Sequence, residues 1–228
     1  TTPTAGVVTV NGKPAEQARR DRDYGMVFQA PVLFDWRTVH ANVALPLEVK
    51  GMSKADRNER VPEMLDLVEL RDFANHYPYQ LSGGMQQRVS IARALALEPS
   101  ILLMDEPFGA LDEMTRERMN SEVQRIWERT GTTIVFVTHS IPEAVFLSSR
   151  VAVMSSRPGR IVRVIDIDLP RPRNDDTRES ERYFALITEV RETLRGKREG
   201  VNDSDASGPT AEARVASVGR TMAEGSVG

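Results

Sequence analysis

The chain has 228 residues, a formal net charge of −3 from 30 Lys+Arg against 33 Asp+Glu, and no cysteine. This length can bury a sizeable core. The lack of cysteine excludes disulfides, cysteine-based metal sites and thiol nucleophiles. The near-neutral charge argues against a nucleic-acid-binding protein that relies on bulk positive charge. No apolar run is long enough to span a membrane and no signal-like segment opens the chain, so we expect a cytoplasmic location.

The first half of the chain predicts short strands followed by a helical stretch. We expect strands over 6–10 and 24–28, and Asn11-Gly12 after the first of them is typical of a hairpin turn. Residues from about 39 to 97 read as helical, with a break over 77–82. This pattern predicts an α/β domain with a mainly helical insertion.

The second half predicts a βαβ unit. The apolar runs over 100–105 and 132–139 are continuous, as is typical of parallel strands covered on both faces. Between them, a helix over 113–130 should begin after Asp112 as the N-cap and stop at Gly131. A further strand over 150–155 should follow a helix that starts near Pro142, and another is expected over 161–167.

The C-terminal part predicts one amphipathic helix and then a tail. Over 179–195, one face at helical spacing is formed by Phe184, Ile187, Val190, Arg191 and Leu194. Residues 196–228 are rich in Gly, Ser, Ala and charge and contain no aromatic residue, so we expect them to be disordered.

Polar side chains follow both central strands. Asp105 and Glu106 come after the first and His139 after the second, and ligands of parallel sheets lie outside such strand ends. One carboxylate can hold Mg²⁺ through water while the next orients or deprotonates a nucleophilic water. The Asp-Glu pair alone reads equally well as two solvated acids.

A Ser-Gly-Gly turn enters a helix expected over 86–96. Its free N–H groups, hydroxyl and positive helix end suit a phosphate group, although a bare Ser-Gly-Gly more often is an ordinary N-cap. The order and spacing of four strings are far more specific than any one of them: LSGGMQQR at 81–88, MDEP at 104–107, GALD at 109–112 and TH at 138–139.

From about residue 4 to 195 the chain resembles the ATP-binding subunits of ATP-binding-cassette (ABC) transporters. LSGGMQQR is similar to the ABC signature, ILLMDEP at 101–107 to the Walker B strand, and GALD to the D-loop. His139 is similar to the switch histidine, and Gln29 in VFQAP to the Q-loop glutamine. The resemblance implies a P-loop-NTPase-like α/β nucleotide-binding domain with a helical subdomain, and the cofactors ATP and Mg²⁺.

The resemblance also implies roles for single residues. Asp105 would bind Mg²⁺, Glu106 would polarise the attacking water and His139 would contact the γ-phosphate. Gln29 would sense both Mg²⁺ and the permease, and Asp112 would couple the two sites of a dimer. Binding of a nucleotide held by the opposite subunit would involve Ser82, Gly83, Gly84 and Gln86.

The resemblance implies domain boundaries and partners as well. The ATPase domain is expected over 1–170 with its helical subdomain over about 39–97, followed by a helical region over 171–195 and the tail. The expected partners are a membrane permease, a second ATP-binding subunit in a head-to-tail dimer and, indirectly, a periplasmic or lipid-anchored solute-binding protein, with no nucleic acid. The subunit would lie on the inner face of the cell membrane.

Subfamily features resemble the nitrate/sulfonate/taurine/bicarbonate importers. They are LFDWRTVHANV at 33–43, SSRPGRI at 155–161 and DLPRPR at 168–173. Within the first string, Phe34 and Trp36 either face the cleft that receives a permease helix or pack into the core of the helical insertion.

The 228 residues contain no P-loop sequence G-x-x-x-x-G-K-[ST]. The nearest string, GVVTVNGKP at 6–14, has five residues between its glycines and ends in Pro14 where a hydroxyl is required. Compared with the family, the chain is therefore expected to lack the first strand and the P-loop. We expect an open sheet edge, unpaired apolar faces and little or no ATPase activity of the chain alone.

Three alternatives stay open at this point. One is a non-transport ABC ATPase that acts on DNA or ribosomes, although the long coiled-coil or zinc insertions typical of that class are not found in this sequence. Another is a non-catalytic partner that offers LSGGMQQR to an intact subunit. The last is an incomplete gene product without activity.

Overall fold

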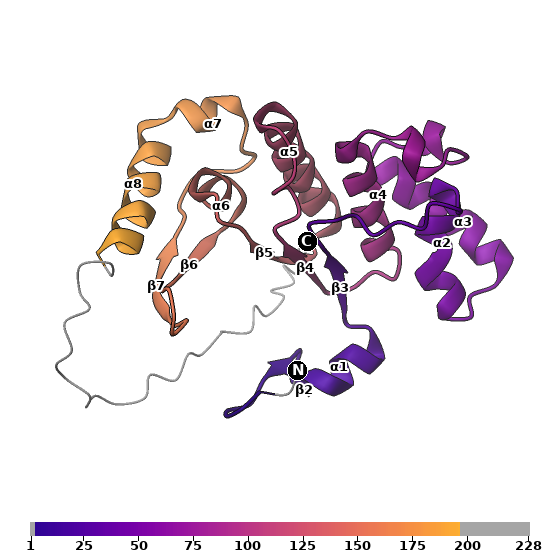
Figure 1. The fold of residues 1–228 in the computed structure, drawn as a ribbon, viewed down its shortest axis with the longest axis horizontal. Coiled ribbons are helices and arrows are strands. Elements are labelled where there is room, and N and C mark those ends of the chain that lie inside the picture. The colour runs from indigo at the N-terminus through magenta and orange to yellow at the C-terminus, as the bar shows by residue number, and fades with distance from the viewer. Residues whose placement is uncertain (1–2, 197–228) are drawn as a thin grey trace, which may run out of the picture.

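The computed structural model describes residues 3–196, so nearly all of the tail predicted over 196–228 lies outside the described residues. Figure 1 shows strands in the middle of the molecule. At one end lie the helices α2 (Val39–Val49), α3 (Lys54–Leu67) and α4 (Gly83–Leu95), and at the other the helices α7 (Asp175–Glu179) and α8 (Glu181–Arg195). A small N-terminal hairpin and α1 project from the strand region. The α/β class predicted from the sequence is confirmed.

The strands form three separate sheets. The central one is parallel, in the order β3 (Tyr24–Val27), β4 (Ile101–Asp105), β5 (Thr133–Val137). The strands β6 (Arg150–Met154) and β7 (Ile161–Asp166) form an antiparallel pair. The strands β1 (Thr9–Val10) and β2 (Lys13–Pro14) form the predicted hairpin, shorter than the strand expected over 6–10. Its turn residues have positive φ, as the Asn-Gly pair predicts.

The predicted helical stretch consists of α2 (Val39–Val49), α3 (Lys54–Leu67) and α4 (Gly83–Leu95), with short 3₁₀ turns at Arg71–Phe73 and Pro78–Gln80. After β4 come α5 (Glu113–Thr130), α6 (Ile141–Leu147), α7 (Asp175–Glu179) and α8 (Glu181–Arg195). The helix α5 has the predicted bounds and is capped by Asp112 and Gly131 as expected. The helix α1 (Ala15–Asp21) has no counterpart among the predicted elements.

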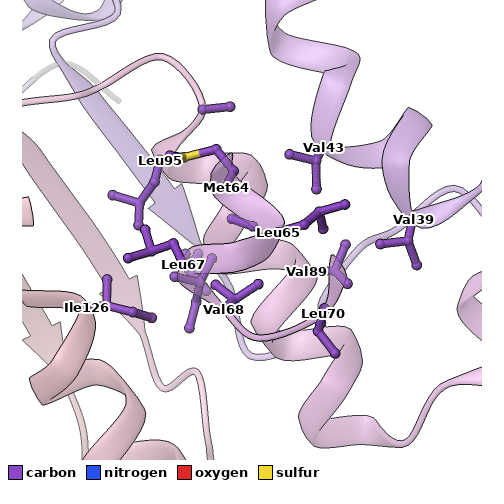
Figure 2. Close-up of a cluster of buried hydrophobic side chains, with 14 of the residues drawn as sticks. Val39, Val43, Met64, Leu65, Leu67, Val68, Leu70, Val89, Leu95 and Ile126 are labelled. Carbon is purple, nitrogen blue, oxygen red and sulfur yellow. The ribbon is translucent and has the colours of Figure 1, made fainter. Parts of the chain in front are cut away.

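The larger hydrophobic core joins the helical region to one face of the central sheet. Figure 2 shows its side chains converging from the helices α2, α3, α4 and α5. The buried face of the sheet contributes Val27, Leu102 and Met104 to the same cluster. The signature helix α4 is therefore packed between the helical region and the strand ends that carry the predicted catalytic residues.

A second core lies between α6, the β6–β7 pair and α8. The helix α8 packs on it through Tyr183, Leu186, Ile187 and Val190, which follow the i, i+3, i+4, i+7 spacing. This corrects the predicted face, because Phe184 is 57 % and Leu194 41 % exposed. The two faces differ by a rotation of about one residue, which apolar spacing alone resolves poorly.

The expectation that the central strands are covered on both faces is wrong for the described residues. Met26, Val135 and Val137 share the second face of the sheet and are 42 %, 49 % and 51 % exposed. A continuous apolar run reports the character of each residue, whereas burial depends on what lies over it. Among residues 3–196, β3 and β5 are the edge strands of the central sheet and its second face is open.

Candidate nucleotide site

The carboxyl ends of β4 and β5 hold two of the predicted catalytic residues close together. Asp105 ends β4 beside Val137 of β5, and the Glu106 amide donates a hydrogen bond to Val137 O at 2.9 Å. Glu106 has a positive φ of 44°, a conformation that is strained for a residue with a side chain and is typical of functional turns. The strand end therefore fixes the backbone from which the Glu106 side chain extends.

His139 meets Glu106 at this edge of the sheet. Its Nδ1 lies 3.1 Å from Glu106 Oε2, and both side chains reach solvent. A carboxylate that orients an imidazole is a recurrent arrangement for handling the protons of a bound water or phosphate. The side chains that follow the two adjacent strands therefore contact each other.

Gln29 approaches the same edge from the other side. It follows β3 and is exposed, and its Nε2 would be 2.9 Å from a side-chain carbon at Gly109. A side-chain carbon there would displace this flexible amide. The predicted Q-loop residue consequently lies against the GALD segment, whose Gly109 amide donates to Glu106 O at 3.1 Å.

The predicted signature residues lie at the N-terminus of α4. Ser82 caps this helix, with its Oγ accepting a hydrogen bond from the Met85 amide at 3.3 Å. Ser82 and Gly83 are exposed, whereas Gly84 is buried, since a Cβ there would be 3.1 Å from Thr115 Cγ2. Two helix N-termini, those of α4 and α5, therefore lie against one another.

Asp112 caps α5 by accepting a hydrogen bond from the Thr115 amide at 2.9 Å. The bonds that Thr115 donates hold the pKa of the Asp112 carboxyl below its usual range, so it is ionised at neutral pH. Gln86 faces elsewhere than predicted for a nucleotide contact. Its amide donates to the backbone oxygens of Pro78 and Leu81, at 2.9 and 3.3 Å.

Four of the predicted site residues line two hollows of the surface that share no lining residue, with Glu106 and His139 in one and Ser82 and Gly84 in the other. A cavity of about 10 Å³, enough for one water, is lined by Glu106, Gly109 and His139 among others. A groove of about 490 Å³ runs along α4 and α5 past Ser82 and Gly84. Two arginines, Arg88 and Arg118, also line it. Catalytic and signature residues thus face different surfaces of the chain.

Sequence reasoning missed Glu143 and Arg116. Glu143 is 4 % exposed, one of its oxygens has no hydrogen-bond partner, and it lines the small cavity beside His139. Burial raises its pKa, opposed by a hydrogen bond from Thr138 and by nearby cations such as Arg116. Arg116 donates to the oxygens of Phe108 and Leu111. The sequence signal that could have indicated Glu143 is its position as a single acidic residue inside the apolar string IPEAVFL at 141–147.

The residues present fit Mg²⁺ as a partly hydrated ion. Mg²⁺ in nucleotide sites takes one or two carboxylates and completes its shell with water and phosphate oxygens, and the exposed Asp105 at the strand end meets that requirement. Between residues 3 and 196, no group of three or more His, Asp or Glu side chains could hold a metal by itself.

In the same span, no helix has the length and apolar character needed to cross a bilayer.

Comparisons with known proteins agree with this geometry. The ABC transporter family profile matches residues 1–109. An uncharacterised ABC transporter ATP-binding protein of Methanocaldococcus jannaschii is 50 % identical over 82 % of this chain and 70 % of its own length. The taurine import ATP-binding protein TauB of Rhizobium johnstonii is 48 % identical, over 83 % of this chain and 72 % of its own length. The nitrate import ATP-binding protein NrtD of Synechocystis sp. is 45 % identical, over 90 % and 79 %.

Solved structures show the same fold. The dimeric structure of the bacterial ABC transporter cassette MJ0796 has a TM-score of 0.61 and 39 % identity, over 73 % of this chain and 75 % of that one. A post-hydrolysis state of that cassette, bound to ADP and Pi, has a TM-score of 0.60. The motif order, the strand-end geometry and these relatives together establish that the chain belongs to the family of ABC transporter ATP-binding proteins.

Proposed function

We propose that this chain is the ATP-binding and ATP-hydrolysing subunit of an ABC importer for a nitrate-, sulfonate- or taurine-like solute. The observation that carries the ATPase part is the contact between His139 Nδ1 and Glu106 Oε2 at the ends of adjacent parallel strands. The solute class is supported by the relatives that are named for taurine and nitrate import. It is also supported by the three subfamily strings in the sequence.

In this proposal each strand-end residue has one task. Asp105 holds Mg²⁺ through water, and Glu106 accepts a hydrogen bond from the water that attacks the γ-phosphate. His139, which is oriented by Glu106, donates a hydrogen bond to a phosphate oxygen. Gln29 senses both the bound Mg²⁺ and the permease. Bound Mg-ATP supplies the phosphoanhydride bond and the ion that neutralises its charge.

The signature residues act on a second subunit. Ser82, Gly83 and Gly84 present a hydroxyl, free amides and the positive end of α4, which together favour an anion. Because they open onto a groove separate from the cavity beside Glu106, the phosphate that they bind belongs to a nucleotide held by the partner. This supports a head-to-tail dimer in which Asp112 couples the two sites.

A permease is the proposed membrane partner. Trp36 is 75 % exposed and its ring lies 4.8 Å from that of Phe34, so Trp36 is not part of the core of the helical region. An exposed Trp that packs on a half-buried Phe forms an aromatic pair of the kind that anchors protein interfaces. The subunit would dock through them on the inner face of the membrane, with a solute-binding protein engaged only through the permease.

Co-purification tests the transport assignment. The tagged chain, expressed in its source organism, should recover a membrane permease from detergent extracts, and Trp36→Ala should lower the yield several-fold. Nucleotide-dependent retention of DNA or ribosomes, with no permease, would instead support a non-transport ABC ATPase. Uptake of labelled taurine and nitrate by a permease complex that also contains a homologous subunit with a P-loop then separates the candidate solutes.

We also propose that the 228-residue chain alone has little or no ATPase activity. A P-loop contributes several charge-assisted hydrogen bonds, each worth about 1.5–3 kcal/mol, and no such sequence occurs in these residues. A phosphate-release assay with Mg-ATP checks this. Turnover that Glu106→Gln abolishes would refute the proposal.

The chain can still complete one site of a mixed dimer. Mixed with a homologous subunit that contains a P-loop, it should associate in an ATP-dependent manner, because its exposed Ser82 and Gly83 remain available. The matched control is Ser82→Arg, which fills the signature turn and should abolish association. If the unmodified chain does not associate with the homologous subunit, the chain is better described as an incomplete gene product without activity.

A further inference from the structure

The segment between β3 and α2 is held at its backbone by buried or half-buried side chains. Gln87 Nε2 donates to Phe28 O at 2.9 Å. Arg93 donates through Nη1 to Val32 O at 2.7 Å and through Nη2 to Pro31 O at 2.8 Å. Both side chains belong to the signature helix α4. Three carbonyls of one loop are thus bound by one helix.

Val32 makes this attachment unusual. Its φ is +47°, in the left-handed region that β-branched residues rarely adopt. Such a conformation persists only where its surroundings enforce it. Here a single guanidinium binds the carbonyl of Pro31, which precedes Val32, and the carbonyl of Val32 itself. The strained turn and the arginine therefore belong to one feature.

The far end of the loop is fixed in a comparable way. Asn42 is fully buried at the start of α2. Its side chain accepts a hydrogen bond from the Phe34 amide and donates to the oxygens of Phe34, Arg37 and Thr38. The exposed Trp36 is consequently carried by a loop whose backbone is bound at both ends.

The helix α4 connects this loop to the signature turn. Its C-terminal half lies so close to β3 that a Cβ at Gly25 would be 2.6 Å from Ala94 O. Its first residue follows Ser82, the N-cap. Gln87 lies about one turn beyond that cap, and it is 1 % exposed, so losing its bond would leave Phe28 O without its buried partner.

We propose that Gln87 and Arg93 are positioning residues that make the loop over 28–36 and the signature helix α4 one mechanical unit, so that a partner docking on Trp36 moves Ser82. This inference rests on the proposed function, in which Trp36 meets a permease. Neither residue touches a nucleotide. Each acts by fixing the backbone of the loop to the helix that presents the signature turn.

Distance measurements between spin labels test the coupling in the full chain, which has no native cysteine to remove. One pair, with cysteines at Asp35 and Met85, reports on the loop against α4. A reference pair at Met85 and Met114 reports on α4 against α5. Arg93→Met should at least double the width of the first distance distribution and leave the second unchanged, and Arg93→Lys should restore part of the order. Gln87→Leu should widen the first distribution less.

Arg88→Met is the matched control. Arg88 lies on the same helix but donates to Val68 O at 3.0 Å, outside the loop, so this variant should leave the first distribution narrow. If Arg93→Met does not fold, Gln87→Leu and Arg93→Lys serve in its place, and each should widen the first distribution by a smaller amount than expected for Arg93→Met. An unchanged first distribution in these variants, or equal widening of both pairs, would overturn the proposal. Since no nucleotide or permease is used, this failure is distinct from failure of the proposed function.

Discussion

The two faces of the central sheet have nearly the same composition and opposite surroundings. On one face Val27, Leu102 and Met104 are buried under α4 and α5. On the other, one residue along each strand, Met26 and Val135 are about half exposed. Residues that pair across the strands point to the same face, so each buried cross-strand row of side chains is followed along the strands by a row on the open face. The comparison shows that strand sequence sets which side chains share a face, while the overlying elements decide how much each face stabilises the fold.

The catalytic residues lie at the boundary between these faces. Glu106 and His139 follow the last strand residues and depend on the sheet for their separation. The covered face alone holds the strands against α4 and α5 in the described residues. We therefore expect the free energy of unfolding to depend strongly on the covered face and weakly on the open one.

The largest effect should follow truncation on the covered face. Leu102→Ala removes a fully buried side chain from the middle of β4 and leaves a cavity, which should lower the free energy of unfolding by about 2–5 kcal/mol. Urea denaturation followed by circular dichroism measures this. The matched control is Leu103→Ala, the same change on the next residue, which faces the open side of the sheet and is only partly buried, so it should cost less than Leu102→Ala. Equal losses for the two variants would contradict the comparison.

A smaller effect is expected where the sheet touches α4. Gly25→Ala would place a methyl group 2.6 Å from Ala94 O, so β3 and α4 must separate, and overpacking of this kind costs about 1–3 kcal/mol. The neighbouring Met26→Ala, on the open face, is the control for a change in β3 itself. Chemical denaturation of both variants would refute the tight contact if Gly25→Ala were no less stable than Met26→Ala.

The third prediction concerns a buried charge beside the site. Burial raises the folded-state pKa of Glu143 above its unfolded value, so ionisation opposes folding as the pH rises through that window above about 4.5. The stability of Glu143→Gln relative to the unmodified chain should therefore improve as the pH rises from about 4.5 through the folded-state pKa of Glu143, and it should stay constant above that pKa. Urea denaturation at each pH measures the difference. For Leu103→Ala, which changes no titratable group, the difference in the free energy of unfolding from the unmodified chain should not depend on pH. If the difference for Glu143→Gln were equally independent of pH, the prediction would be wrong.

Most elements could be predicted from the sequence because their signals are local. The bounds of α5 follow from Asp112, Gly131 and the apolar spacing between them, and the β1–β2 hairpin follows from Asn11-Gly12. The meeting of Glu106 and His139 could be predicted as well, since parallel strands end at the same edge. Each of these needs only a short stretch of chain or a general rule of topology.

The features that sequence reasoning missed depend on contacts between distant segments. Whether Val135 is covered is decided by elements outside β5. The turning of Gln86 toward Pro78 and the burial of Glu143 beside His139 are set by tertiary packing. The helix face of α8 differed by one residue because Tyr183 and Phe184 are neighbouring aromatic residues and either could pack into a core. Tyr183 is the one that packs, and its hydroxyl donates a hydrogen bond to Pro142 O.

The smallest expected effect lies on the open face. Val135→Thr keeps the β-branched shape that suits a strand and changes a side chain that is 49 % exposed, so the free energy of unfolding should change by about 0.5 kcal/mol or less. The same change removes apolar surface from an edge strand, which should raise the concentration at which light scattering detects association. A loss of about 2 kcal/mol or more, found by urea denaturation at low protein concentration, would mean that this face is covered in solution. The stability contrast between Leu102 and Leu103 would then disappear as well, because both rows of the sheet would be buried.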